Sequence, residues 1–125
     1  MLLAVGDVAF ADLYRETLVA AGWQVDAAHD WRSTEELLLK STPDVVVLDG
    51  LPDIRQIDAL ENIRRRTKQL LVVFLTDTLE VGDLERAKEL GVQAFLIKTR
   101  ATREMLPETL GKLLQSRSSA DLTQS

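Results

Sequence analysis

The sequence predicts an α/β domain built on a doubly wound sheet of five parallel strands with five helices. Two wholly apolar runs near the middle of the chain, 45–48 and 70–75, have the composition of strands that are buried on both faces. Around them, shorter apolar stretches alternate with segments whose apolar residues recur at helical spacing. This alternation is typical of a parallel sheet covered by helices on both sides, and we expect the strand order 2-1-3-4-5.

Each element is placed from its apolar period and from the residues that stop it. Strands are expected at 2–5, 23–28, 44–49, 70–75 and 94–97. Helices are expected at 9–21, 33–40, 55–66, 81–90 and 102–114. The second helix begins with a sequence, 33–36, that fits a capping box, and Pro107 must lie early in the last helix or distort it. The inward face of the first helix is expected to carry Phe10, Leu13, Thr17, Leu18 and Ala21.

The chain length indicates a single domain. A chain of 125 residues is long enough to bury a core without disulfides or metals. We expect the domain to occupy residues 1–116. Residues 117–125 are polar, Ser-rich and without an apolar period, which predicts a flexible tail or the start of a linker.

The composition excludes several classes of protein. With 46% hydrophobic and 28% charged residues, the chain is an ordinary globular protein. It has no apolar run of transmembrane length, so we expect no membrane contact. The absence of cysteine fits a cytoplasmic location. A net charge of −5 argues against direct nucleic-acid binding, and the one basic run, 64–66, falls where cations complement the end of a helix.

Four chemically distinctive residues, Asp7, Asp49, Thr76 and Lys98, close four of the predicted strands. By itself, Asp49 followed by Gly50 is also a common turn pair. In the expected strand order, however, all four side chains converge on one edge of the sheet. Two carboxylates there suit a hard cation such as Mg²⁺, while a hydroxyl and an ammonium suit the oxygens of a transferred phosphoryl group.

These residues lie in stretches that, as an ordered set, resemble the receiver domain of response regulators in two-component signalling. The matching stretches are 3–7, 43–49, 51–53, 73–76 and 91–98. The resemblance covers residues 1–116 and implies the flavodoxin-like form of the doubly wound fold.

The resemblance also implies a role for each site residue. Asp49 would be the phosphoacceptor, taking a phosphoryl group from a sensor histidine kinase or a phosphotransfer protein. Asp7 and Asp49 would bind Mg²⁺. Thr76 would bond a phosphoryl oxygen, and Lys98 would pair with the phosphoryl charge. Phe95 occupies the position of the aromatic switch.

Four positions depart from the family pattern. Gly6 stands where the family usually has a second acid, and the loop that contains Pro52 is one residue short. Both changes predict a weakened Mg²⁺ site, and Gly6→Asp is expected to tighten it if the backbone does not require glycine there. Asp77 and Thr99 replace a small residue and a proline, so the lining of the pocket has also changed.

Three functions compete. The leading one is a phosphorylatable receiver, which is a signalling module and not an enzyme. The second is a pseudo-receiver that binds partners independently of phosphorylation. The third, an aspartyl phosphatase, generally needs an acid two positions after the nucleophile, where this chain has Leu51.

The expected output surface is the face formed by the fourth helix, the fifth strand and the fifth helix. Its charges have both signs, which suits a homodimer because a two-fold interface must complement itself. An ordinary solvated surface would look the same, and that alternative remains open.

Overall fold

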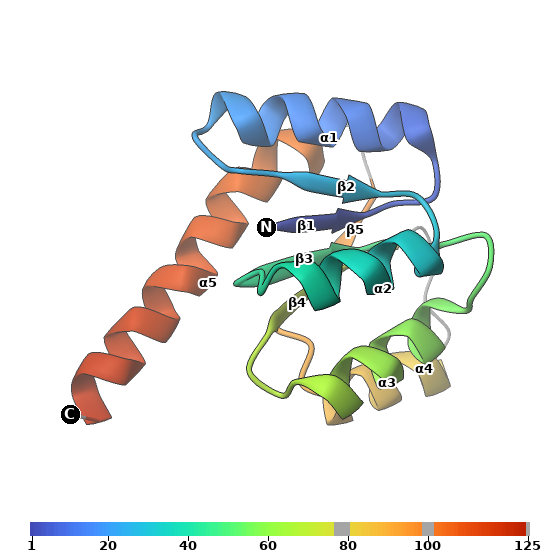
Figure 1. Cartoon of the computed structure of the whole chain (residues 1–125). Helices are drawn as coiled ribbons and strands as arrows, with labels where there is room; N and C mark the ends of the chain where they lie inside the picture. The colour runs from blue at the N-terminus through green and yellow to red at the C-terminus, as the bar shows by residue number, and fades with distance from the viewer. Residues whose placement is uncertain (77–80, 99–101, 125) are drawn as a thin grey trace.

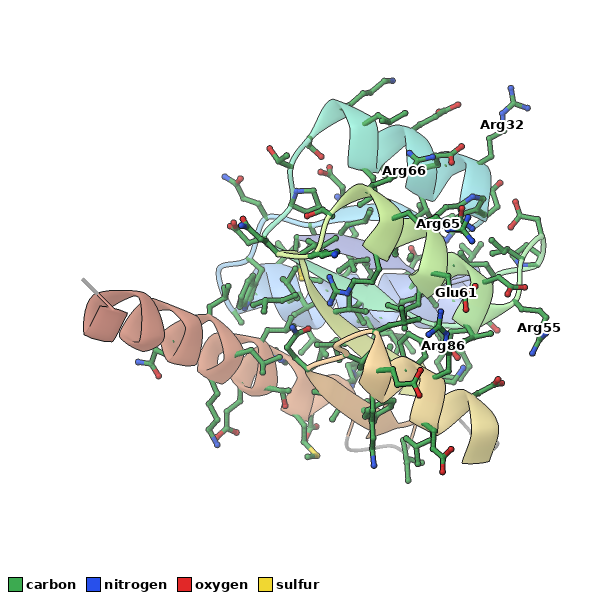
Figure 2. All side chains as sticks on the ribbon, turned by 90° about the horizontal axis from the view of Figure 1, so that it is seen from below. Arg32, Arg55, Glu61, Arg65, Arg66 and Arg86 are labelled. Atoms are coloured by element: carbon green, nitrogen blue, oxygen red, sulfur yellow. The ribbon has the colours of Figure 1, made fainter. Side chains whose placement is uncertain are left out.

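The protein forms one parallel sheet with the strand order β2-β1-β3-β4-β5, as the sequence predicts. The computed structural model describes residues 1–76, 81–98 and 102–124 (Figure 1). The strands are β1 (Leu2–Ala4), β2 (Asp26–Ala28), β3 (Val45–Leu48), β4 (Leu71–Thr76) and β5 (Ala94–Ile97). The helices are α1 (Val8–Ala20), α2 (Trp31–Lys40), α3 (Gln56–Arg66), α4 (Val81–Glu89) and α5 (Thr102–Gln124).

Two hydrophobic layers sandwich the sheet, because side chains alternate between its faces. On β3, Val46 and Leu48 join the layer that includes residues of α2, α3 and α4, whereas Val45 and Val47 join the layer under α1 and α5. Figure 1 shows α1 and α5 on one side of the sheet and the other three helices on the opposite side. Burial on both faces explains why the central strands are wholly apolar.

The inward face of α1 differs from the expected one. Ala11, Tyr14 and Leu18 are buried, whereas Phe10 and Leu13 are 46% and 41% exposed. The buried face of α1 is rotated from the expected one. Tyr14 was not counted among the apolar residues because of its hydroxyl, although most of its side chain is an apolar ring. The prediction for Phe10 and Leu13 was therefore wrong, as it was for Ala21, which is exposed just beyond the end of α1.

Helix α2 begins two residues before the expected capping box. Its N-cap is Asp30, whose Oδ1 accepts a hydrogen bond from the Ser33 N–H at 2.7 Å. The buried Thr34 hydroxyl donates back to the Asp30 carbonyl at 2.7 Å. The hydrogen bond from Ser33 lowers the pKa of the Asp30 carboxyl. A carboxylate cap at Asp30 thus replaces the hydroxyl cap that the sequence suggested.

Helix α5 continues to Gln124, well past its expected end at Leu114. Neither Gly nor Pro occurs after Gly111, and Ser, Gln and Asp lower helix propensity only slightly. The expected end of this helix at Leu114 was therefore wrong, and Figure 1 shows the last part of α5 extending beyond the sheet. That residues 117–125 are a flexible tail or the start of a linker stays a prediction. Pro107 lies inside the helix. The division of the chain at residue 116 stays a prediction.

The described part of the chain contains no helix that is both long and apolar enough to span a membrane.

Candidate functional site

The predicted site residues follow neighbouring strands at the carboxyl edge of the sheet. Asp49 comes directly after β3, Thr76 ends β4, and Lys98 comes directly after β5. The backbone brings them together: the Asp49 N–H donates to the Ala4 carbonyl at 2.8 Å, and the Lys98 N–H donates to the Thr76 carbonyl at 2.8 Å. Asp49 is 5% exposed and Thr76 is 8% exposed. The structure therefore places an acid and a hydroxyl in a largely buried environment.

The Asp49 carboxylate is held at both oxygens. The ammonium of Lys98 lies 2.9 Å from Oδ2, and the Gly50 N–H donates to Oδ1 at 2.7 Å. Lys98 also lies 5.5 Å from the centre of the Phe10 ring, a distance suited to a cation–π interaction. Burying a carboxylate is costly unless it is paired and hydrogen-bonded, so this arrangement compensates the charge of Asp49.

Asp7 lies at the same edge of the sheet, at the start of α1. It is exposed, and its side chain caps α1 by accepting a hydrogen bond from the Phe10 N–H at 3.2 Å. Among the residues described, no three His, Cys, Asp or Glu side chains gather closely enough to hold a metal ion. The predicted pair of metal-binding carboxylates is thus one buried, lysine-paired acid and one exposed helix cap.

Gly6 is required by the backbone around it. Its N–H donates to the Gly50 carbonyl at 3.0 Å, and a Cβ built on it would lie 2.6 Å from that same oxygen. The Cδ of Pro52 would be 3.3 Å from this Cβ. The condition for Gly6→Asp to tighten Mg²⁺ binding is therefore not met, because the loop after β3 fills the space that a side chain would need.

The other end of this loop is held too. Asp53 Oδ1 accepts a hydrogen bond from the Trp31 N–H at the start of α2, at 2.7 Å. The loop 50–53 is therefore bonded to the loop after β1 at Gly6 and to α2 at Trp31. The short loop and the absence of an acid at position 6 are therefore linked, because the loop lies where the side chain of that acid would be.

Two carboxylates at this edge of the sheet have the ligand chemistry that Mg²⁺ prefers. Carboxylate oxygens are the right ligands, and Mg²⁺ in proteins commonly rests on one or two carboxylates and keeps several waters. Asp7 and Asp49 provide that chemistry. The Gly50 carbonyl, however, already accepts the Gly6 N–H, which reduces its value as a further ligand.

The predicted switch residue, Phe95, packs inward against the core. Its ring lies edge-on to Phe74, with centroids 5.8 Å apart and an interplanar angle of 79°. It is partly buried and contacts the hydrophobic layer under α3 and α4. Asp77 and Thr99, the other departures from the family pattern, lie outside the described residues.

Gln56, the first residue of α3, belongs to the site although sequence reasoning missed it. Its Nε2 donates to the Leu48 carbonyl at 2.8 Å and to the Leu75 carbonyl at 3.0 Å. These carbonyls belong to the residues directly before Asp49 and Thr76. No sequence pattern marks such a contact, because it joins three segments that meet only in the folded chain.

Arg64 was expected to be one of the cations at the end of α3, but its guanidinium is buried. It donates to the carbonyls of Leu90 at 2.6 Å, Leu70 at 2.6 Å and Gly91 at 3.0 Å. Burial lowers its pKa from the ordinary value, but arginine remains charged. Arg64 thus ties the end of α4 to the start of β4.

Comparison with known proteins agrees with this geometry. The family model of the response regulator receiver domain matches residues 2–109, so the chain belongs to that family. Members are receiver domains of two-component response regulators, which are generally signalling modules without enzymatic activity. A search of curated proteins finds no match.

Solved structures show the same fold. A CheY-like receiver domain from Methanospirillum hungatei JF-1 has a TM-score of 0.84 at 18% identity, over 94% of this chain and 95% of that one. The signal receiver domain of a putative Luxo repressor protein from Vibrio parahaemolyticus has a TM-score of 0.85 at 22% identity, over 99% and 95%. The Mn²⁺-bound form of response regulator Rcp1 has a TM-score of 0.74 at 22% identity, over 86% and 88%.

Proposed function

We propose that this receiver accepts a phosphoryl group on Asp49 from a sensor histidine kinase or a phosphotransfer protein. The observation that carries the proposal is the buried Asp49 carboxylate, held 2.9 Å from the Lys98 ammonium at the carboxyl edge of the sheet. The cytoplasm, where such kinases present their phosphohistidine, is the proposed location. Residues 1–116 form the proposed receiver unit.

The transfer requires an oxygen of Asp49 to attack phosphorus while the bond from phosphorus to the histidine nitrogen breaks. The imidazole leaves with the electron pair of that bond. Lys98 then pairs with the negative phosphoryl oxygens, and the Thr76 hydroxyl donates a hydrogen bond to one of them. Catalysis by such a site is mostly positioning and charge stabilisation.

Mg²⁺, bound by Asp7 and Asp49, would supply positive charge against the transferring group. We propose that this site is weak, for two reasons. Gly6 contributes no carboxylate, and the Gly50 carbonyl is already bonded to the Gly6 N–H at 3.0 Å.

The proposed output runs from Thr76 through Phe95 to the face formed by α4, β5 and α5. Phe95 has no hydroxyl that needs a partner, so its ring loses little by lying against Phe74. Homodimerisation through this face is part of the proposal. Sedimentation with and without a phosphoryl mimic tests it, and a strict monomer in both states would leave only a heterologous partner for this face.

A second function, a phosphorylation-independent pseudo-receiver, is favoured by two observations. The loop 50–53 is hydrogen-bonded to Gly6, where the family usually has an acid. The Asp7 side chain caps α1. In this alternative the fold serves only to bind partners, and Asp49 and Lys98 form a structural ion pair.

Intact-mass measurement after incubation with acetyl phosphate and Mg²⁺ decides between the two functions. The phosphorylatable receiver gains the mass of one phosphoryl group, and Asp49→Asn abolishes the gain. A gain that survives Asp49→Asn overturns the assignment of Asp49. No gain with any small-molecule or protein donor supports the pseudo-receiver.

A further inference from the structure

Strand β4 extends past the end of β3 just where the site begins. Leu48, the last residue of β3, pairs with Phe74, so the paired register of β3 and β4 ends there while β4 continues to Thr76. The next amide available from the β3 side, the Gly50 N–H, is directed to Asp49 Oδ1 instead. The paired register of the two strands therefore ends before Asp49 and Thr76 are reached.

The side chain of Gln56 bridges this gap. Its Nε2 donates one hydrogen bond to the Leu48 carbonyl at 2.8 Å and another to the Leu75 carbonyl at 3.0 Å. A carboxamide nitrogen has two N–H groups, and both are used. Because Gln56 opens α3, the bridge also fixes the start of that helix against the two strands.

We infer that Gln56 is a positioning residue that sets the separation between the phosphoacceptor Asp49 and the hydroxyl of Thr76. Each carbonyl that it binds immediately precedes one of these residues. A shift at Leu48 or Leu75 therefore moves Asp49 or Thr76 directly. The kinetic part of this inference rests on the proposed function, because it assumes phosphoryl transfer to Asp49.

The chain offers a matched control in Gln93. Its side-chain amide also bonds to β4, but at the opposite end, where Oε1 accepts from the Val72 N–H at 2.7 Å. Gln56→Met and Gln93→Met remove the same chemical group from two glutamines that both bond to β4. Methionine keeps the length of the side chain, so each variant loses the amide hydrogen bonds and little packing.

The first experiment compares the amide chemical shifts of the two variants with those of the wild type, without any ligand. We expect Gln56→Met to shift the signals of Asp49, Gly50 and Thr76, and Gln93→Met to leave them in place. Equal shifts at the site in both variants, or none in either, would overturn the positioning role. This experiment does not depend on phosphorylation, so it remains decisive if the wild type accepts no phosphoryl group.

The second experiment measures the rate at which acetyl phosphate labels Asp49. Small displacements of reacting groups are costly, so Gln56→Met should slow labelling about tenfold or more, with Gln93→Met within about twofold of the wild type. Thermal unfolding provides the stability comparison. If both variants lose equal stability but only Gln56→Met labels slowly, the bridge acts on the site. If labelling slows equally in both, Gln56 contributes stability alone.

Discussion

The two halves of the site are built differently. On the side of β4 and β5, Asp49, Thr76 and Lys98 converge, with a 2.9 Å ion pair between the acid and the ammonium. On the side of β1, backbone fills the space beside Gly6, and Asp7 caps a helix. The half that would hold a phosphoryl anion is complete, whereas the half that would hold a cation is reduced. This difference supports the proposal that the receiver keeps its phosphoacceptor but binds Mg²⁺ weakly.

The largest expected effect is on the rate of phosphorylation, and it comes from removing the Lys98 ammonium. Lys98→Met should slow labelling of Asp49 by acetyl phosphate about 10²-fold, because a positioned positive charge stabilises the developing negative charge of the transfer. A time course of intact mass measures it. Lys112→Met, on an exposed lysine of α5 paired with Glu108 at 3.2 Å, is the control and should label normally. Equal rates for the two variants would show that Lys98 takes no part.

The reduced half is tested by giving Gly6 a side chain. Gly6→Ala should cost about 1–3 kcal/mol of unfolding free energy, because its Cβ cannot lie 2.6 Å from the Gly50 carbonyl without moving the loop. Urea denaturation measures the loss. Gly50→Ala is the matched control and should change little, since a Cβ there meets nothing within 4 Å.

Gly6→Asp then asks whether an acid restores metal binding. Because its Cβ meets the same backbone, Mg²⁺ titration should show no tighter binding than in the wild type. Tighter binding by a well-folded Gly6→Asp would mean that the loop opens readily, and the two halves would then be less different than the structure indicates.

Phe10 contacts both halves of the site. It lies in the first turn of α1, which Asp7 caps, and its ring lies near the Lys98 ammonium. Phe10→Leu should cost about 0.5–1 kcal/mol of stability through the lost cation–π interaction, because the ring is partly exposed. The double-mutant cycle with Lys98→Met isolates this interaction. An unchanged cost of Phe10→Leu in the Lys98→Met background would assign the loss to packing alone.

The smallest effect concerns pH, at the start of α2 where the closed loop is attached through Trp31. The pKa of Asp30 is lower in the folded protein than its ordinary value of 3.8, chiefly through the hydrogen bond from Ser33. The contribution of the Asp30 carboxylate to folding stability is therefore fully present above pH 3.8. It is lost as the pH falls through the lower pKa that Asp30 has in the folded protein. Asn also caps helices, so Asp30→Asn should fold and lose less stability between pH 4 and pH 2. A wild type and variant with parallel pH profiles would contradict this.

Most of the fold and the central acid–lysine pair could be predicted from the sequence. Apolar runs identify strands that are buried on both faces, and the topology of a parallel sheet then brings the ends of β3, β4 and β5 together. The identities of Asp49, Thr76 and Lys98 follow from reading the residue that closes each strand. Such predictions succeed because they depend on local patterns and on one general rule of sheet architecture.

The tertiary structure alone decided how the rest of the site is used. Gly6 was recognised as a missing acid, but only the approach of the Gly50 carbonyl shows that no side chain fits there. Gln56 carries no pattern, because its partners are backbone carbonyls of two strands. Arg64 was expected to complement the end of a helix, yet its buried guanidinium binds three backbone carbonyls. Periodicity reports which residues avoid water, whereas contacts to the backbone of distant segments depend on where the folded chain places those segments.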